Sequence, residues 1–174
     1  MIKFFIEPGY DVKAPVRDYG NAGIDFFIPN HTEEFAKAFE EKNNSAYLLK
    51  GDDGNYFIRI FPHDRVNIPS GIRSFIPVNV ALEAQNKSGI AAKKGLVYGA
   101  SVIDANYQGI IHLNMINTTN KEVDIPLGTK IVQFIPRLID TSAIEVYTGI
   151  SFEEFYKDFE FSNRGEGAFG STGI

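Results

Sequence analysis

Arginine, glycine and hydroxyl residues gather at the C-terminal end of the sequence, in Arg164-Gly-Glu-Gly-Ala-Phe-Gly-Ser-Thr-Gly173. Glycines let main-chain N–H groups approach an anion closely, and a guanidinium offers a planar fork to phosphate oxygens. Ser171 and Thr172 add donors, while Phe169 offers a ring face to a base. This composition predicts an arm that grips phosphates and closes over a nucleotide. A frayed terminus without function is the alternative.

The cost of ordering such an arm indicates how it behaves. Fixing ten residues costs on the order of 10 to 20 kcal/mol, and little apolar surface is present here to offset it. Charge-assisted hydrogen bonds contribute roughly 1.5 to 3 kcal/mol each, and base stacking contributes about 1 to 3 kcal/mol. Because these gains need a polyphosphate nucleotide, we expect residues 164–174 to be flexible when empty and ordered when loaded.

A carboxylate and a phenol stand three residues apart in Val102-Ile-Asp-Ala-Asn-Tyr-Gln-Gly109, a turn between two apolar runs. Asp104 has the chemistry of a general base, although a turn aspartate that bonds its own backbone is the commoner case. Tyr107 alone is more often a core residue than a ligand contact. Upstream, Asn86-Lys-Ser-Gly-Ile-Ala-Ala-Lys-Lys-Gly95 supplies a hydroxyl, three cations and two glycines, which suit either phosphates or a solvated loop.

Composition excludes several classes of partner. The 174 residues include 22 acidic and 17 basic side chains, a formal charge of −5, so we expect no nucleic-acid partner. There is no cysteine, which excludes disulfides and thiolate chemistry. His31, His63 and His112 are too scattered to predict a metal cluster. Without a signal peptide or a run of about 20 apolar residues, we expect a cytoplasmic protein with no membrane contact.

Short runs rich in Ile, Val, Phe and Tyr are broken by Gly, Pro, Asn and Asp, which is typical of a mainly β protein. With 44% apolar residues, the chain is sufficient for one hydrophobic core and one domain. No regular helical pattern separates the runs, so parallel βαβ units are not expected. The predicted strands are 2–6, 24–28, 56–61, 72–82, 110–116, 130–135 and 143–147.

Two helices and a hairpin are also predicted. The segment 32–43 carries two phenylalanines one helical turn apart, and the pair Asn30 and Glu33 resembles a capping arrangement. Ser151-Phe-Glu-Glu154 is a capping box that opens a short second helix. Asp53-Gly54 lies at the middle of strand-forming residues and predicts a hairpin turn.

Five short motifs follow one another along the chain: Ala22-Gly-Ile-Asp-Phe26, Lys87-Ser-Gly89, Gly99 to Gly109, Gly128-Thr-Lys-Ile-Val-Gln133 and Arg164 to Gly173. In this order and spacing they resemble the motifs of the trimeric deoxyuridine triphosphatases, the dUTP pyrophosphatases. The resemblance implies a compact β-barrel or jelly-roll-like fold over residues 1–163. It also implies a closing arm at 164–174, whereas residues 30–62 are longer than the family needs and are predicted to be a helix-plus-hairpin insertion.

The resemblance implies the reaction dUTP plus water to dUMP and pyrophosphate. Asp104 would deprotonate the water that attacks the α-phosphorus. Tyr107 would lie against the deoxyribose and leave no room for a 2′-hydroxyl. Main-chain groups of residues 99–104 would recognise the uracil edge and exclude the 5-methyl group of thymine. Ser88 would stabilise charge on the leaving pyrophosphate.

Other roles follow from the same resemblance. Gln133 would contact the phosphates from a neighbouring chain, in a homotrimer whose three sites lie between subunits. Asp25 would reach Mg²⁺ through ordered water. The arm would hold the γ-phosphate while its phenylalanine covers the base. The implied substrate-binding residues are Lys87, Ser88, Gly89, Gly99, Val102, Ile103, Tyr107, Gln133, Arg164, Phe169, Gly170, Ser171 and Thr172.

The chain departs from the family pattern at several positions. Asn86 and Lys87 replace a proline and an arginine, so a point charge stands where the family has a bidentate fork. Lys130 also replaces an arginine, Ile110 an acidic residue and Ala168 a glycine. Because the proposed base, hydroxyl, glutamine and arm arginine are retained, we expect activity with altered phosphate affinity.

Two other functions compete with this one. A dCTP deaminase shares the fold and a similar third motif, but Asn114 stands where that family has its glutamate, and that family lacks the arm. A regulatory module would use the nucleotide site as a switch and residues 30–62 as the surface for a protein partner. A decoration lying on the barrel or a longer subunit contact is the commoner explanation for such residues.

Overall fold

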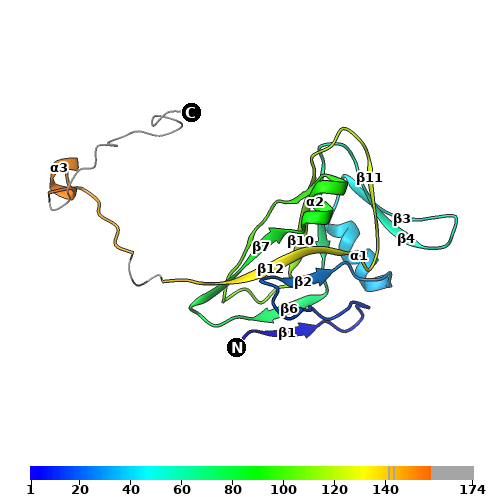
Figure 1. Cartoon of the computed structure of the whole chain (residues 1–174), viewed down its shortest axis with the longest axis horizontal. Coiled ribbons are helices and arrows are strands. Elements are labelled where there is room, and N and C mark those ends of the chain that lie inside the picture. The colour runs from blue at the N-terminus through cyan, green and yellow to red at the C-terminus, as the bar shows by residue number, and fades with distance from the viewer. Residues whose placement is uncertain (141, 143, 158–174) are drawn as a thin grey trace. The chain divides into compact units, whose positions relative to one another are not determined.

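The computed structural model describes residues 1–140, 142 and 144–157. The chain divides into two compact units, Met1–Asp140 and Thr141–Ile174. The first unit holds the described strands and two helices, and the second holds a one-turn helix, α3 (Phe152–Phe155) (Figure 1). The predicted arm at 164–174 and its boundary lie outside the described residues.

Antiparallel strands build the first unit. They are β1 (Lys3–Ile6), β2 (Ile24–Phe27), β3 (Ala46–Lys50), β4 (Tyr56–Ile60), β5 (Arg65–Pro69), β6 (Ile72–Phe75), β7 (Val80–Asn86), β8 (Leu96–Tyr98), β9 (Val102–Ile103), β10 (His112–Asn117), β11 (Val123–Pro126) and β12 (Lys130–Leu138). They pair in four sheets, ordered β1-β6, β5-β10-β8, β11-β4-β3 and β2-β12-β7-β9. The predicted mainly β fold is confirmed, as four small sheets rather than one closed barrel. Every strand pairing in the described part of the chain is antiparallel, as expected for a fold without parallel βαβ units.

The alternation of side chains along β10 explains how it serves both core and site. Leu113, Met115 and Asn117 are buried, while His112 before them and Asn114 between the first two are half-buried. Successive side chains of a strand point to opposite faces, so the first three face the core and the other two face outward. The outward positions lie beside the loop that carries the third motif.

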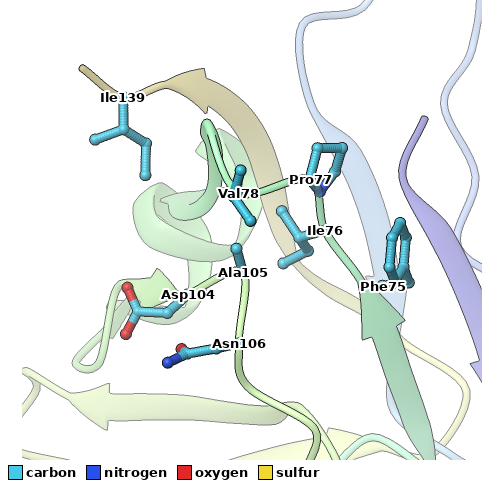
Figure 2. A pocket seen from close by; sticks show the side chains of 8 residues that line it. All are labelled: Phe75, Ile76, Pro77, Val78, Asp104, Ala105, Asn106 and Ile139. Atoms are coloured by element: carbon cyan, nitrogen blue, oxygen red, sulfur yellow. The ribbon is translucent and has the colours of Figure 1, made fainter. Parts of the chain in front are cut away.

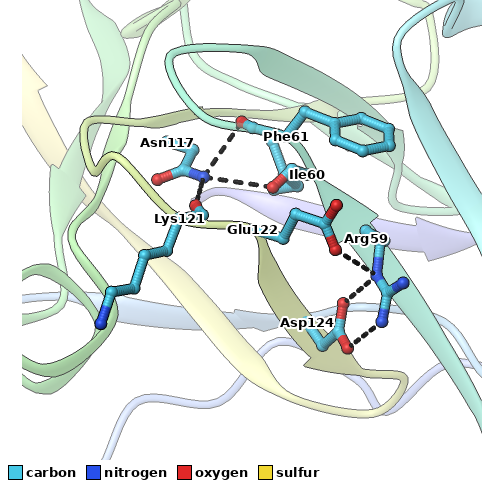
Figure 3. A network of polar contacts seen from close by, with 7 residues as sticks. All are labelled: Arg59, Ile60, Phe61, Asn117, Lys121, Glu122 and Asp124. Carbon is cyan, nitrogen blue, oxygen red and sulfur yellow. Dashed lines mark hydrogen bonds and ion pairs between the residues drawn. The ribbon is translucent and has the colours of Figure 1, made fainter.

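A buried amide holds the end of β10 against two other segments. Asn117 is fully buried, and its Nδ2 donates to the carbonyls of Ile60, Phe61 and Lys121 at 3.1, 3.0 and 2.7 Å (Figure 3). An unsatisfied buried donor costs about 1–3 kcal/mol, so these contacts matter for stability. They fix the position of β10 relative to the end of β4.

Helix α1 (Glu33–Lys42) lies where the phenylalanine spacing predicts it. Phe35 and Phe39 are buried in the core, with 0% and 1% of their surface exposed. The predicted cap is wrong by two residues: the Thr32 hydroxyl, not Asn30, accepts from the Phe35 N–H at 3.1 Å. In α3, the Ser151 hydroxyl accepts from the Glu154 N–H at 3.1 Å, as the capping box predicts. Among the described residues, no helix is long and apolar enough to cross a membrane.

The predicted hairpin is present as β3 and β4, and Gly54 in its turn has φ +82°. Its Asp53 carboxylate accepts from the Asn55 N–H at 3.0 Å, which stabilises the turn. Strand β4 also pairs with β11, and Ile58 and Ile60 on it are fully buried. The helix and hairpin between residues 30 and 62 therefore supply core residues rather than surface alone.

Three details of the strand prediction are wrong. The predicted strand 72–82 is interrupted after Phe75, where Pro77 lacks an N–H and its carbonyl accepts from the Val80 N–H at 2.9 Å in a turn. Residues 144–147 form no strand. The last strand runs on to Leu138, three residues beyond its predicted end, because its pairing with β7 continues. Strands β5, β8, β9 and β11 and one helix were not predicted.

The unpredicted helix is α2 (Ser88–Lys94), in the segment that suits phosphates or a solvated loop. It ends at Gly95, whose φ of 63° lies in the left-handed region, a common helix termination. A glycine as the second helical residue and the seven-residue length weaken the sequence signal. The second motif, Lys87-Ser-Gly89, thus forms the junction between β7 and α2.

Candidate active site

Three of the predicted motifs meet around β12. This strand pairs with β2 on one side and with β7 on the other. Gln133 on β12 lies opposite Asp25 on β2, and Lys87 directly follows the last residue of β7. The antiparallel order therefore brings the first, second and fourth motifs together, although they are far apart in sequence (Figure 1).

Asp25 is the centre of this group. Only 6% of its surface is exposed, and its two carboxylate oxygens bind two lysines, with Lys87 Nζ 2.5 Å from Oδ1 and Lys130 Nζ 3.0 Å from Oδ2. Burial alone raises the pKa of Asp25, but the hydrogen bonds and charges of both lysines outweigh burial and hold this pKa below its usual range. The same contact raises the pKa of Lys130. The two lysines are the residues that replace family arginines.

This arrangement does not fit the predicted magnesium role of Asp25. A carboxylate that holds Mg²⁺ through water must face that water, whereas both oxygens of Asp25 face ammonium groups. Two cations beside the carboxylate also repel a third. Within the described residues, no group of three or more His, Cys, Asp or Glu side chains is placed to hold a metal ion.

Gln133 is held in place by the backbone around it. Its Nε2 donates to the Asn86 carbonyl at 3.0 Å. A Cβ atom at Gly23 would overlap the Gln133 side chain, so the glycine of the first motif leaves the space that this side chain occupies. The Gln133 side chain therefore reaches the residue that directly precedes the second motif.

The third motif places Asp104 and Tyr107 on one tight turn. The Tyr107 N–H donates to the Asp104 carbonyl at 3.1 Å, and the Tyr107 hydroxyl donates to the Ile110 carbonyl at 2.8 Å. A Cβ atom at Gly109 would overlap the Tyr107 ring, so glycine there permits the close approach of the ring. In the described part of the chain, the Asp104 carboxylate makes no hydrogen bond and is exposed. It is not a turn aspartate that caps its own backbone.

Two hollows adjoin this turn, and Asp104 lines both. The first is lined by Asn67, Ala100, Val102, Ile103, Asp104, Tyr107 and His112. The second is mostly apolar, with Ile76, Val78 and Ile139 facing Ala105 (Figure 2). Figure 2 shows the Asp104 carboxylate turned away from Ile76 and Val78. The carboxylate is therefore directed away from the apolar side chains of the second hollow.

The hairpin before Asp104 is tied to β10 by Asn114. The Gly99 N–H donates to the Asn114 carbonyl at 3.0 Å, and the Ala100 N–H donates to Asn114 Oδ1 at 3.2 Å. A Cβ atom at Gly99 would overlap Asn114 Oδ1. Gly99 is thus a position where close approach excludes larger residues, and the Asn114 side chain has a structural task.

The predicted site residues form two groups. Val102, Ile103, Asp104 and Tyr107 line the first hollow, with Gly99 on the adjoining hairpin. Lys87 and Gln133 lie beside Asp25, Ser88 and Gly89 follow Lys87 at the start of α2, and none of the four lines either hollow at Asp104. Residues Arg164, Phe169, Gly170, Ser171 and Thr172 lie outside the described residues. Asn67 and His112 were missed, although the alternation along β10 was a signal for His112, and Ala100 lies within the predicted main-chain segment 99–104.

Comparisons with known proteins identify the family. The dUTPase family model matches residues 55–173. A deoxyuridine 5′-triphosphate nucleotidohydrolase of Debaryomyces hansenii is 33% identical over 81% of this chain and 89% of its own length. One of Yarrowia lipolytica is 33% identical over 60% of this chain, and the match spans 62% of that protein.

Solved structures show the same fold. The dUTPase of Staphylococcus bacteriophage 80alpha with dUpNHpp has a TM-score of 0.67 at 20% identity, over 100% of this chain and 99% of that chain. The dUTPase of phage phi11 of S. aureus, described for its species-specific insert, has a TM-score of 0.61 at 18% identity, over 89% and 99% of the two chains. The fold is therefore that of the dUTPases. With the family model matching well over half of its residues, the chain belongs to the dUTPase family.

Proposed function

We propose that this protein hydrolyses dUTP to dUMP and pyrophosphate. The observation that carries the proposal is the turn that joins Asp104 to Tyr107 beside one hollow, with the carboxylate unbonded in the described part of the chain. A general base must be free to reach the proton that it removes, and this carboxylate is. Family membership supplies the substrate class.

The chemistry follows from these positions. Water attacks the α-phosphorus, one of its protons passes to the Asp104 carboxylate, and the bond from the α-phosphorus to the bridging oxygen breaks, which releases pyrophosphate. The Tyr107 ring, held by its bond to the Ile110 carbonyl, is a flat wall for the deoxyribose. The Ser88 hydroxyl contributes hydrogen bonding where charge develops on the leaving group.

The phosphates are assigned to the group around Asp25. Lys87 and Lys130 bring two positive charges to one place, and Gln133 adds an amide beside them. The arm residues 164–173 complete this grip and cover the base. Magnesium is implied by the resemblance, and a mutant of the phi11 phage dUTPase is described with a structural Mg(II) ion. Because Asp25 does not fit that role, no step is assigned to the metal.

We infer a homotrimer with sites between subunits. In the described part of one chain, the residues around Asp25 that are assigned to the phosphates line neither of the two hollows at Asp104, and in this proposal a second copy of the chain brings such residues to the hollow. The first unit also exposes apolar side chains suited to a subunit contact, with Phe75, Val78 and Leu138 exposed by 61%, 91% and 83%. A cytoplasmic location and a protein partner for residues 30–62 stay predictions from the sequence.

The oligomeric state is tested by light scattering after size-exclusion chromatography. We expect a mass three times the 19.4 kDa of one chain. A monomeric mass at the protein concentration of the activity assay, with activity retained, would contradict sites that need two chains.

The activity is tested by incubating pure protein with dUTP and with each of the four standard deoxynucleoside triphosphates. We expect pyrophosphate from dUTP and at least about 100-fold less from the others, because the hollow is built to hydrogen-bond one base. The competing deaminase predicts ammonia from dCTP and no pyrophosphate from dUTP. Asn114 lacks a carboxylate, and its Oδ1 is engaged by the Ala100 N–H, so that outcome is not expected.

A further inference from the structure

Two polar side chains in the hollow beside Asp104 have no part in the proposed mechanism. Asn67 on β5 and His112 on β10 line this hollow together with Tyr107. Within the described residues, the Asn67 carboxamide makes no side-chain hydrogen bond, so both its donor and its acceptor are available. In ligand pockets, a small number of placed polar groups fix the orientation of the ligand and provide specificity.

The strand register places these two side chains on the same face. Strands β5 and β10 are antiparallel, with Asn67 opposite Asn114 and His112 opposite Pro69. Directly opposed residues share a face, and so do residues two apart on one strand. Asn67 and His112 are therefore diagonal neighbours, and β9 and the Asp104 turn supply the other residues of the hollow.

The backbone of Asn67 is held by helix α1. Strand β5 is at an edge of its sheet, where its outer main-chain groups have no partner strand. Asn43, which caps α1, replaces that partner: its Oδ1 accepts from the Asn67 N–H at 2.7 Å, and its Nδ2 donates to the Asn67 carbonyl at 3.1 Å. The same Nδ2 donates to the Phe39 carbonyl at 2.8 Å, which fixes Asn43 to the helix.

The chemistry of this surface suits a neutral group. Burial lowers the pKa of His112, a hydrogen bond with the Ile110 carbonyl partly opposes this, and the charge of Lys42 on α1 lowers it further. The imidazole is therefore neutral at pH 7, and because its one N–H is engaged by the Ile110 carbonyl, its other ring nitrogen offers a lone pair to a ligand. Together with a carboxamide it offers donors and acceptors without charge. These match the alternating acceptors and donor of a pyrimidine imide and do not match a phosphate.

We propose that Asn67 and His112 bind the pyrimidine base of the substrate and determine which base is accepted, and that Asn43 positions them. The proposal rests on the proposed dUTP hydrolysis and adds side chains to a recognition otherwise assigned to main-chain groups of residues 99–104. It also gives the helix between residues 30 and 62 a task in the site. The helix secures the strand that carries one of the two side chains.

The test measures kcat and KM for dUTP and dCTP in Asn67→Ala and His112→Ala. Each variant is expected to lose roughly 3- to 10-fold in kcat/KM for dUTP, carried by KM, because one base contact is lost in ground state and transition state alike. The ratio of kcat/KM for dUTP to kcat/KM for dCTP should also fall in each variant. Asn67→Ala keeps both main-chain bonds to Asn43, so its stability in urea should equal that of the parent protein.

Asn43→Ala tests the positioning role. It should lower both the stability and the dUTP-to-dCTP ratio, whereas loss of stability with an unchanged ratio would reject the positioning role. The matched controls Asn55→Ala and His31→Ala lie outside both hollows and should keep the ratio of the parent protein.

The outcomes separate the two proposals. If the parent protein releases no pyrophosphate from dUTP, the proposed function itself is rejected. If the parent protein hydrolyses dUTP, but Asn67→Ala and His112→Ala both keep its KM and its ratio, only the base-binding role is overturned.

Discussion

Asp104→Asn is expected to lower kcat on dUTP by at least about 100-fold, the usual contribution of a general base. Asparagine has nearly the same shape but cannot take a proton from water at neutral pH. The fold should not change, because the turn uses the Asp104 carbonyl, and the carboxylate makes no bond in the described part of the chain. Steady-state pyrophosphate release measures the loss, and urea unfolding should show equal stability.

The matched control is Asp52→Asn. Asp52 is an exposed carboxylate in the turn between β3 and β4, outside both hollows that Asp104 lines. Its loss removes the same charge and should leave kcat unchanged. A decrease of less than about tenfold for Asp104→Asn would show that another group removes the proton.

The predicted site residues that the structure brings together at one hollow lie within one short segment. Asp104, Tyr107 and the two residues that precede Asp104 belong to a single predicted motif. The structure places all four at one hollow. Such a segment carries its geometry with it, because the glycine that permits the close approach of the Tyr107 ring is only two residues away. The same holds for the hairpin with Gly54, where local propensity alone determines the turn.

The missed residues depend on pairings between distant segments. Asn67 reaches the hollow only because β5 pairs with β10 and Asn43 holds its edge, and no local pattern shows either contact. Helix α2 was missed because a glycine near its start hides a helical run. The environment of Asp25 is also set by tertiary contacts, since Lys87 and Lys130 are 62 and 105 positions away along the chain.

Those contacts predict that Asp25→Asn destabilises the protein. The variant leaves two ammonium groups beside each other, and the amide can accept from one lysine while its NH₂ faces the other. Lys87 and Lys130 retain 23% and 43% exposure, so water relieves part of the cost, and a loss of about 1–3 kcal/mol in the free energy of unfolding is expected. Urea unfolding at pH 7 measures it.

The control is Asp124→Asn, which removes a carboxylate that also binds a cation. Asp124 accepts from Arg59 at 2.8 and 2.7 Å, and Glu122 lies 3.4 Å from the same guanidinium (Figure 3). Its side chain is 44% exposed and a second acid remains beside Arg59, so its replacement should cost less than that of Asp25. Equal losses in the two variants would show that burial between two lysines adds nothing.

The loss in Asp25→Asn should also depend on pH in a defined direction. The lysines hold the pKa of Asp25 below its value of about 3.9 in the unfolded chain, so the unfolded state binds its proton first as pH falls. The stability contributed by ionised Asp25 is therefore fully present above about pH 4 and is lost as pH falls through the lower pKa of the folded state. The difference in unfolding free energy between the parent protein and Asp25→Asn should be constant from pH 7 to about pH 5 and shrink below about pH 4. A difference that grew on acidification would mean that the carboxylate is bound in its protonated form and that the two lysines do not hold it ionised.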